Sequence, residues 1–111
     1  MRKYPEKIIS IRKLARKAIP QILMDVPQKS NFILSKFEEK YSEKCDNNFL
    51  CKCKNQSGSS PEWKHQVRWA IQDLKYNSLI QYDNGSETYS ITKLGKVVLN
   101  SAEKYDKMFN V

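Results

Sequence analysis

The sequence has a single histidine, three glycines and no apolar run that approaches the ~20 residues of a membrane span. The sequence offers one imidazole, and it has neither a nucleophile elbow nor a glycine-rich phosphate loop. Residues that could catalyse acyl or phosphoryl transfer are therefore not recognisable, and we expect a protein that is not an enzyme. The first ten residues, MRKYPEKIIS, lack the apolar stretch and the cleavage site of a secretory signal. A cytosolic or nuclear protein without a membrane segment is therefore expected.

Cysteine is scarce and odd in number. Cys45, Cys51 and Cys53 are the three thiols, and a Cys-x-Cys pair cannot easily close on itself within disulfide geometry. Together with His65 they would provide three sulfurs and one imidazole for zinc, but the spacing lacks the paired Cys-x2–4-Cys knuckles of zinc domains. We interpret them as thiols in a reducing compartment and expect neither a metal nor another cofactor.

Acidic residues are in the minority, with 12 Asp and Glu against 20 Lys and Arg and a net charge of +8. The surplus is concentrated between Met1 and Lys17, where seven basic residues stand against one acid. A weaker surplus runs from Lys52 to Arg68. Such a surplus suits a polyanionic partner, because each cation that neutralises a phosphate releases a counterion. The alternative is a solvated face that only keeps the protein soluble.

Residues 1–26 are expected to form a basic, amphipathic helical segment, and residues 27–111 the remainder of one compact domain. The apolar positions at helical spacing are Ile8, Ile11, Ala15, Ala18, Ile19 and Ile22, with Lys13, Arg16 and Lys17 on the other side. Pro20 interrupts the pattern and predicts either a kink or a second short helix that ends near Asp25.

The middle of the chain contains two further predicted helices. The letters FIL at 32–34 indicate a short strand, and Ser35 with Glu38 forms a capping box that predicts a helix over KFEEKYSEKC. Ser60 as N-cap and Pro61 as first residue predict a third helix. Its apolar face is expected to consist of Trp63, Val67, Ala70, Ile71 and Leu74. We expect it to end at Asn77 in a left-handed conformation.

The C-terminal part predicts a β-hairpin and a last helix. Two alternating runs in SLIQYDNGSETYSIT flank Asn84-Gly85, a strong short hairpin signal, and Thr92 caps the following amphipathic segment. The order is helix, short strand, helix, loop, helix, hairpin, helix. This is a mainly α fold with a small β-hairpin (α+β), laid out as a winged helix-turn-helix with an extra basic N-terminal helix and a C-terminal helix.

The stretch PEWKHQVRWAIQDLKYNSLIQYDNGSETYSITKLGK resembles the winged-helix N-terminal domain of Mrr-type restriction endonucleases and related endonuclease-associated modules. The residues that carry the resemblance are Trp63, Val67-Arg68-Trp69-Ala70, Leu74-Lys75, Leu79-Ile80, Tyr89, Ile91-Thr92 and Gly95. They cover about the C-terminal half, and Asn77-Ser78 replaces the usual glycine. The resemblance implies the specificity or sensor module of a restriction or defence type system, without its nuclease half.

The candidate DNA-binding residues fall into four groups. The outer face of the third helix carries Lys64, His65, Arg68 and Gln72, and Arg and Gln can read guanine and adenine in the major groove. Phosphate contacts are expected from the segment before that helix and from the N-terminal face. The hairpin tip has no Lys or Arg, so its minor-groove contact would be weak. The segment before the helix contributes Lys52, Lys54, Ser59 and Ser60, the N-terminal face contributes Lys13, Arg16 and Lys17, and the hairpin tip contributes Asn84.

Two functions follow as expectations. The first is a non-catalytic module that binds double-stranded DNA, in the nucleoid-containing cytoplasm or in a nucleus. The alternative is a protein–protein or dimerisation winged helix without direct DNA reading, in which the Ile-rich N-terminal face and Trp69 dock a partner or a second copy. Trp69 would otherwise pack under the N-terminal helix in a second small core. A membrane-surface role is not expected, because the N-terminal segment lacks large aromatic anchors.

Overall fold

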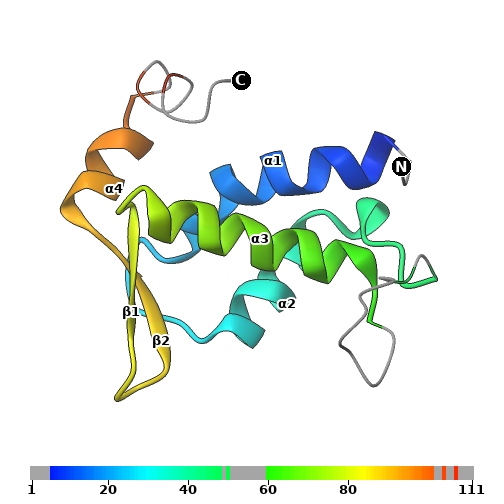
Figure 1. The fold of residues 1–111 in the computed structure, drawn as a ribbon, viewed down its shortest axis with the longest axis horizontal. Coiled ribbons are helices and arrows are strands. Elements are labelled where there is room, and N and C mark those ends of the chain that lie inside the picture. Colours follow the sequence, from blue (N-terminus) through cyan, green and yellow to red (C-terminus); the bar gives the residue numbers. More distant parts are fainter. Residues whose placement is uncertain (1–5, 49, 51–59, 102–103, 105–106, 108–111) are drawn as a thin grey trace.

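The computed structural model of the chain describes residues 6–48, 50, 60–101, 104 and 107. Its elements are α1 (Glu6–Ile22), α2 (Ser30–Lys40), the 3-10 turn η1 (Ser42–Lys44), α3 (Glu62–Tyr76), β1 (Ile80–Asp83), β2 (Thr88–Ile91) and α4 (Lys93–Leu99). The described chain is thus mainly helical with one two-stranded antiparallel sheet, as the α+β prediction stated. Figure 1 shows α1 and α3 running side by side, with the hairpin projecting beyond one end of α3.

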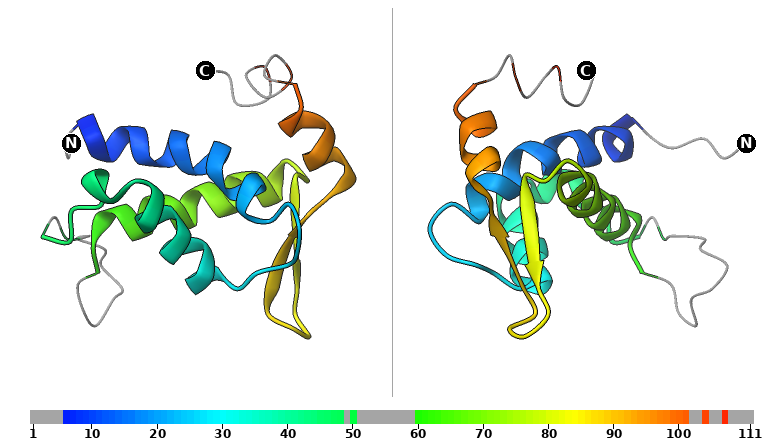
Figure 2. Two further views of the ribbon diagram at one scale, coloured as in Figure 1. Left: turned by 180° about the vertical axis from the view of Figure 1, so that it is seen from behind. Right: turned by 60° about the vertical axis from the view of Figure 1, so that its left-hand side comes forward.

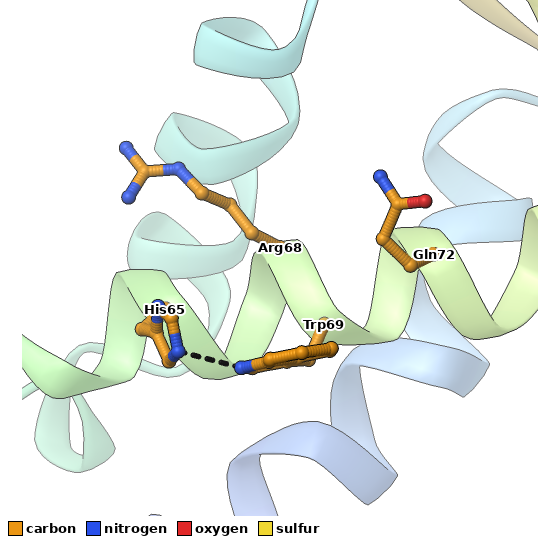
Figure 3. Close-up of a pocket in the computed structure, with 4 residues that line it drawn as sticks. All are labelled: His65, Arg68, Trp69 and Gln72. Carbon is orange, nitrogen blue, oxygen red and sulfur yellow. Dashed lines mark hydrogen bonds between the residues drawn. The ribbon is translucent and has the colours of Figure 1, made fainter. Parts of the chain in front are cut away.

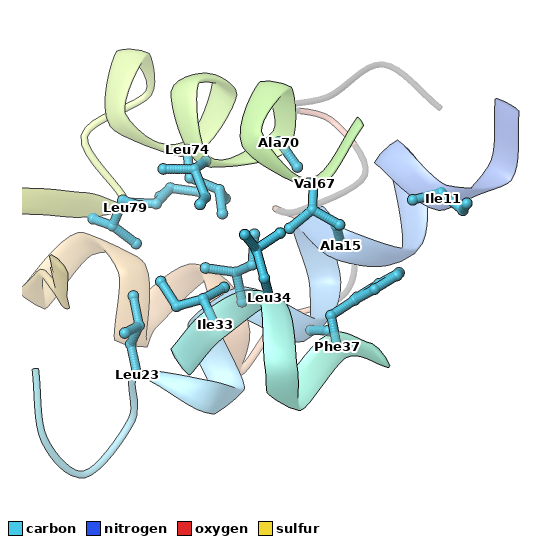
Figure 4. Packing of buried hydrophobic residues seen from close by; sticks show 14 of the residues in the cluster. Ile11, Ala15, Leu23, Ile33, Leu34, Phe37, Val67, Ala70, Leu74 and Leu79 are labelled. Carbon is cyan, nitrogen blue, oxygen red and sulfur yellow. The ribbon is translucent and has the colours of Figure 1, made fainter. Parts of the chain in front are cut away.

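One apolar core joins all of these helices. Buried side chains from α1, α2, α3, the start of β1 and α4 form a single cluster, and those labelled in Figure 4 point into a common interior. The most extensive packing is between α1 and α3. Ile11 and Ile19 of α1 are completely buried, and burying such a side chain stabilises a fold by about 1.5–3 kcal/mol. The N-terminal helix is therefore part of the core.

Of the two alternatives predicted for Pro20, the second short helix is absent. The helix continues through Pro20 to Ile22, and no second helix follows to Asp25. Pro20 lies in the last turn, where its missing N–H costs a single helical bond, and it is buried there. The N–H of Leu23 still donates to the carbonyl of Ile19 at 3.0 Å. The helical pattern therefore extends past the proline without a break.

The predicted strand at 32–34 and the predicted capping box are wrong. Both segments belong to α2, which begins at Ser30, contains Ser35 and ends at Lys40. The reason is that Ile33, Leu34 and Phe37 form one buried helical face. Strand pairing occurs earlier instead, at Gln28, which exchanges two backbone hydrogen bonds of 2.9 and 2.8 Å with Tyr89 of β2. Figure 2 shows this segment passing beside the hairpin on its way to α2.

The prediction for the apolar face of α3 is confirmed. Trp63, Val67, Ala70, Ile71 and Leu74 are all buried. The N-cap is Pro61, one residue later than predicted. Within the core the indole N–H of Trp63 donates to Oδ1 of Asn47 at 2.9 Å, so this buried polar group is satisfied.

The left-handed residue after α3 is Ser78, with φ of 62°, and not the predicted Asn77. Asn77 keeps a φ of −91°, and its side-chain amide donates to the carbonyl of Asp73 at 2.8 Å. A residue with a Cβ pays about 1–2 kcal/mol for the left-handed conformation. This strained position lies within the Asn77-Ser78 pair that replaces the glycine expected from the resemblance.

The hairpin is present, but its loop is longer than predicted. Strand pairing ends at Asp83 and Thr88, so residues 84–87 form the loop. Glu87 takes the positive φ, 56°, and Gly85 does not. The carboxylate of Asp83 organises this loop by accepting hydrogen bonds from the Ser86 hydroxyl at 2.8 Å and the Gly85 N–H at 3.1 Å. These bonds lower the pKa of Asp83.

Thr92 and Gly95 attach α4 to the junction between α3 and β1. Thr92 caps α4, as predicted, by accepting from the Gly95 N–H at 2.9 Å. Its hydroxyl also lies 2.6 Å from the carbonyl oxygen of Ser78. A Cβ at position 95 would overlap the carbonyl oxygen of Leu79 and lie 2.7 Å from Cγ1 of Ile91. Only glycine fits this approach without movement of the backbone.

We expect Gly95→Ala to lower the free energy of unfolding by about 2–3 kcal/mol, because the overlapped atom belongs to the backbone and cannot rotate away. Gly85→Ala is the matched control. Its Cβ would meet Asp83 Oδ1 at an ordinary 3.5 Å, so a change within about 0.5 kcal/mol is expected. Urea unfolding of both variants measures the difference, and equal losses would contradict this explanation.

Candidate functional site

The outward side of α3 is a continuous stripe of six residues. It lies opposite the apolar face and follows helical spacing, i, i+3, i+4, i+7, i+10 and i+11. None of the six is acidic, and Tyr76 and Trp69 are 88% and 46% exposed. The members of this stripe, which we call the α3 outer face, are His65, Arg68, Trp69, Gln72, Lys75 and Tyr76.

Four of these side chains line a shallow, open concavity of about 260 Å³: His65, Arg68, Trp69 and Gln72 (Figure 3). Three of the four are residues that the sequence pointed to as base-reading candidates. Lys64, the fourth candidate on this helix, lies at the edge of the face with its Nζ 5.7 Å from the ring centroid of the buried Trp63. Trp69 was not among the candidate DNA-binding residues, although its position outside the apolar stripe signalled exposure.

Trp69 is exposed and yet fixed in place. Its indole N–H donates to Nε2 of His65 at 2.6 Å, and the two rings meet edge to face, 5.5 Å between centroids and 86° between planes. The guanidinium carbon of Arg12, from α1, lies 5.5 Å from the centroid of the indole. The interpretation that Trp69 packs into a second small core is therefore wrong. The ring lies against α1 through Arg12 but stays open to solvent.

Asp73 binds two arginines of α1. Arg12 donates to both of its carboxylate oxygens, at 2.8 and 2.7 Å, and Arg16 donates at 3.3 Å. Burial alone would raise the pKa of Asp73, but the hydrogen bonds and charges of Arg12 and Arg16 outweigh it, and the pKa is lowered. A two-pronged arginine–carboxylate pair is directional. The pair sets the register between α1 and α3 and holds Arg12 against Trp69.

The three basic residues predicted to share one face of α1 do not share it. Lys13 and Lys17 are exposed. The Arg16 side chain is only 17% exposed and lies toward Asp73. Helical spacing alone placed all three opposite the isoleucines, and it could not assign a partner 57 residues away in the sequence. Lys13 and Lys17 therefore remain the accessible cations among the three.

The other predicted positions are separated from the concavity. Ser60 lies just before α3, and its hydroxyl has no hydrogen-bond partner within the described part of the chain. Asn84 is exposed in the hairpin loop, at the far end of the hairpin from α3 (Figure 1). Lys52, Lys54 and Ser59 lie outside the described residues. The described candidates thus lie on α3 or just before it and on α1, with Asn84 apart.

The described cysteine is a core residue. Burial, with smaller effects from the charges of Glu38 and Glu43, raises the pKa of the Cys45 thiol to about 11. It is therefore protonated at neutral pH. Cys51 and Cys53 lie outside the described residues. Across residues 6–48 and 60–101, no group of three or more His, Cys, Asp or Glu side chains is placed to hold a metal ion.

Comparison with known proteins found no matching family model, curated protein or solved structure. Among the described helices, none is long and apolar enough to cross a membrane. The chemistry of the α3 outer face, which offers hydrogen-bond donors and acceptors, cations and an exposed aromatic ring, is consequently the basis for assigning a function.

We expect Asp73→Asn to lower the free energy of unfolding by about 1–3 kcal/mol at pH 7, because the arginines then face a neutral partner across α1 and α3. The carboxylate stabilises the fold above its unfolded-state pKa, near 3.8, and this contribution is lost as pH falls through the lower folded-state pKa. The difference between wild type and variant should therefore shrink below about pH 4. Unfolding measured at several pH values tests this, with the exposed Asp25→Asn as control; a difference independent of pH would contradict it.

Proposed function

We propose that the protein is a non-catalytic module that binds double-stranded DNA through a winged-helix domain, with α3 in the major groove. The observation that carries this proposal is the α3 outer face, which is exposed along the helix and free of acidic residues. Its Arg68 and Gln72 are residue types that hydrogen-bond guanine and adenine edges. Both are exposed and project from the same side of α3 (Figure 3).

The order and pairing of the elements support the winged-helix proposal. In a winged helix-turn-helix, the helix that precedes the hairpin is the recognition helix, and here that helix is α3. The bridge between Gln28 and Tyr89 adds a short third partner to the hairpin from the segment between α1 and α2. The winged-helix layout places a short strand between the first two helices. The extended segment at Gln28 has that place in the order, four residues before the strand predicted at 32–34.

Backbone contacts are assigned to the exposed lysines of α1. Lys13 and Lys17 lie one helical turn apart, so they can follow one phosphate backbone. Phosphate contacts add affinity and carry no base information. Arg12 and Arg16 are excluded from this role in the proposal, because their charges are engaged by Asp73. Specificity would then come from α3, and general affinity from α1.

The resemblance to the N-terminal domain of Mrr-type enzymes supports a place as a specificity or sensor module in a restriction or defence type system. Most residues that carry the resemblance have packing roles here, such as Trp63, Val67 and Gly95. Arg68, Trp69 and Lys75 differ, because they are exposed within the same motif. A role in binding would explain why this motif includes three residues that the core does not require.

The alternative, a protein-binding or dimerising winged helix, loses part of its basis. It depended on the Ile-rich face of α1, but Ile11 and Ile19 are buried in the core of the same chain. What still favours a protein partner is the exposure of Trp69 and Tyr76, since aromatic residues are enriched at interfaces. Affinity for DNA that falls steeply with salt supports the first function, and absence of binding to any DNA at low salt removes it.

We expect the double variant Lys13→Gln, Lys17→Gln to weaken binding to all DNA sequences alike. The slope of log K against log salt concentration should become shallower by about one unit for each lost phosphate contact. The matched control is Lys93→Gln, Lys96→Gln, which removes the same charge from two exposed positions on α4. An equal change in both double variants would mean that only net charge matters.

We expect Arg68→Ala to relax sequence preference, and Lys64→Ala to lower affinity evenly. Arg68 is exposed on the α3 outer face, whereas Lys64 is half-buried at its edge. A two-pronged Arg–guanine contact contributes about 1–3 kcal/mol of discrimination, and a phosphate contact contributes none. Selection of preferred sites by wild type and both variants measures this. Recovery of the wild-type motif by Arg68→Ala would show that Arg68 does not read bases.

A further inference from the structure

Trp69 presents an aromatic face that the core does not use. Trp69 is 46% exposed, and because single exposed apolar side chains are common on protein surfaces, what distinguishes Trp69 is how it is held. The bond to His65 and the contact with Arg12 restrict its rotation. Arg12 is itself fixed by two hydrogen bonds to Asp73. The indole is therefore already oriented before any ligand binds.

The two faces of this ring are not equivalent. Figure 3 shows the indole edge-on, with α1 on one side of it and the side chains of Arg68 and Gln72 projecting on the other. Arg12, which comes from α1, lies over the ring. Trp69, Arg68 and Gln72 line the same concavity of about 260 Å³, and Figure 3 shows the two polar side chains on the side of the indole away from α1. A flat ligand in this concavity would have an aromatic ring to stack on and two polar side chains beside it.

A nucleobase matches this combination. It has a π-face that stacks on tryptophan and an edge that Arg or Gln can hydrogen-bond. A base inside a duplex offers its edge but not its face, because its neighbours cover both faces. Stacking on Trp69 therefore requires a base that has left the helix. Arg68 and Gln72 favour a purine, since their preferred partners are guanine and adenine.

We propose that the concavity on α3 binds a single unpaired or extruded purine stacked on Trp69, so that the preferred DNA is a duplex with one displaced base. This inference rests on the proposed DNA-binding function and names its substrate. The paired flanks would still be held by Lys13 and Lys17, so a duplex with a bulge should bind better than a single strand. Displacement is least costly where the base is mismatched, damaged or already unpaired.

The test compares three DNAs of one sequence: a fully paired duplex, the same duplex with one bulged adenine, and the single strand. We expect wild type to bind the bulged duplex roughly tenfold more tightly than the paired duplex. Trp69→Ala should remove this preference, and Trp69→Phe should retain part of it. Phe32→Ala is the matched control, because it removes an aromatic side chain that is 40% exposed on α2, outside the α3 outer face. It should keep the preference.

A direct signal for stacking is the fluorescence of 2-aminopurine placed at the bulge. It should be quenched by wild type and by Phe32→Ala, and not by Trp69→Ala. Equal binding of paired and bulged duplexes, or a preference that survives Trp69→Ala, would overturn the stacking proposal and leave DNA binding intact. Tighter binding to the single strand would overturn the assignment of duplex flanks. Absence of binding to all three DNAs at low salt would instead reject the proposed function itself.

Discussion

The packing of α1 against α3 is the contact on which the rest of the molecule depends. It brings together the longest apolar faces of the chain, and Asp73 fixes their register by binding Arg12 and Arg16. Removal of one of these three side chains would leave a partly buried charge without its partner. The resulting loss of stability would exceed the net stabilisation that the ion pair contributes. The same contact determines which side of α3 is buried and which is exposed. The composition of the α3 outer face is therefore a consequence of core packing.

Arg12 connects this packing to the candidate site. Its guanidinium donates to Asp73 in one direction and covers a face of Trp69 in the other. A rigid aromatic side chain loses little conformational entropy when a ligand binds, because its freedom was already restricted on folding. The stability of the α1–α3 packing and the orientation of Trp69 thus both depend on the Arg12 side chain. Substitutions at Arg12 would affect both and would be difficult to interpret alone.

The sequence predicted the features that depend on periodicity and on short-range chemistry. The buried stripe of α3, the hairpin and the Thr92 cap follow from spacing of 3.6 or 2 and from local hydrogen bonding, and all three are present. The buried stripe of α3 also indicated which side of the helix is exposed, and the base-reading candidates were predicted on that side. Trp69 joins the same stripe by its spacing, but the orientation of its ring could not be predicted, because it depends on contact with Arg12 of α1.

The errors have a common cause in contacts between distant segments. Residues 32–34 read as a strand in isolation, but the core requires Ile33 and Phe37 on one helical face. Arg16 read as a surface cation until Asp73 was placed beside it. The left-handed residue after α3 is Ser78, where the sequence favoured Asn77, and the hairpin loop, predicted about Asn84-Gly85, has its left-handed residue at Glu87. At both places the backbone geometry that the junction or the loop requires outweighs the conformational preference of a single residue.

The acids of the hairpin have a consequence for the encounter with a polyanion. Residues 80–91 contain Asp83 and Glu87 and no Lys or Arg, and Asp83 is held ionised by its hydrogen bonds. Lys13 and Lys17 lie on a helix that extends away from the hairpin (Figure 1). The hairpin tip is therefore a local negative patch on a chain whose net charge is +8. If the protein binds DNA as proposed, the phosphate backbone would repel this patch and turn the hairpin outward, beginning at a separation set by the Debye length, about 10 Å in 0.1 M salt.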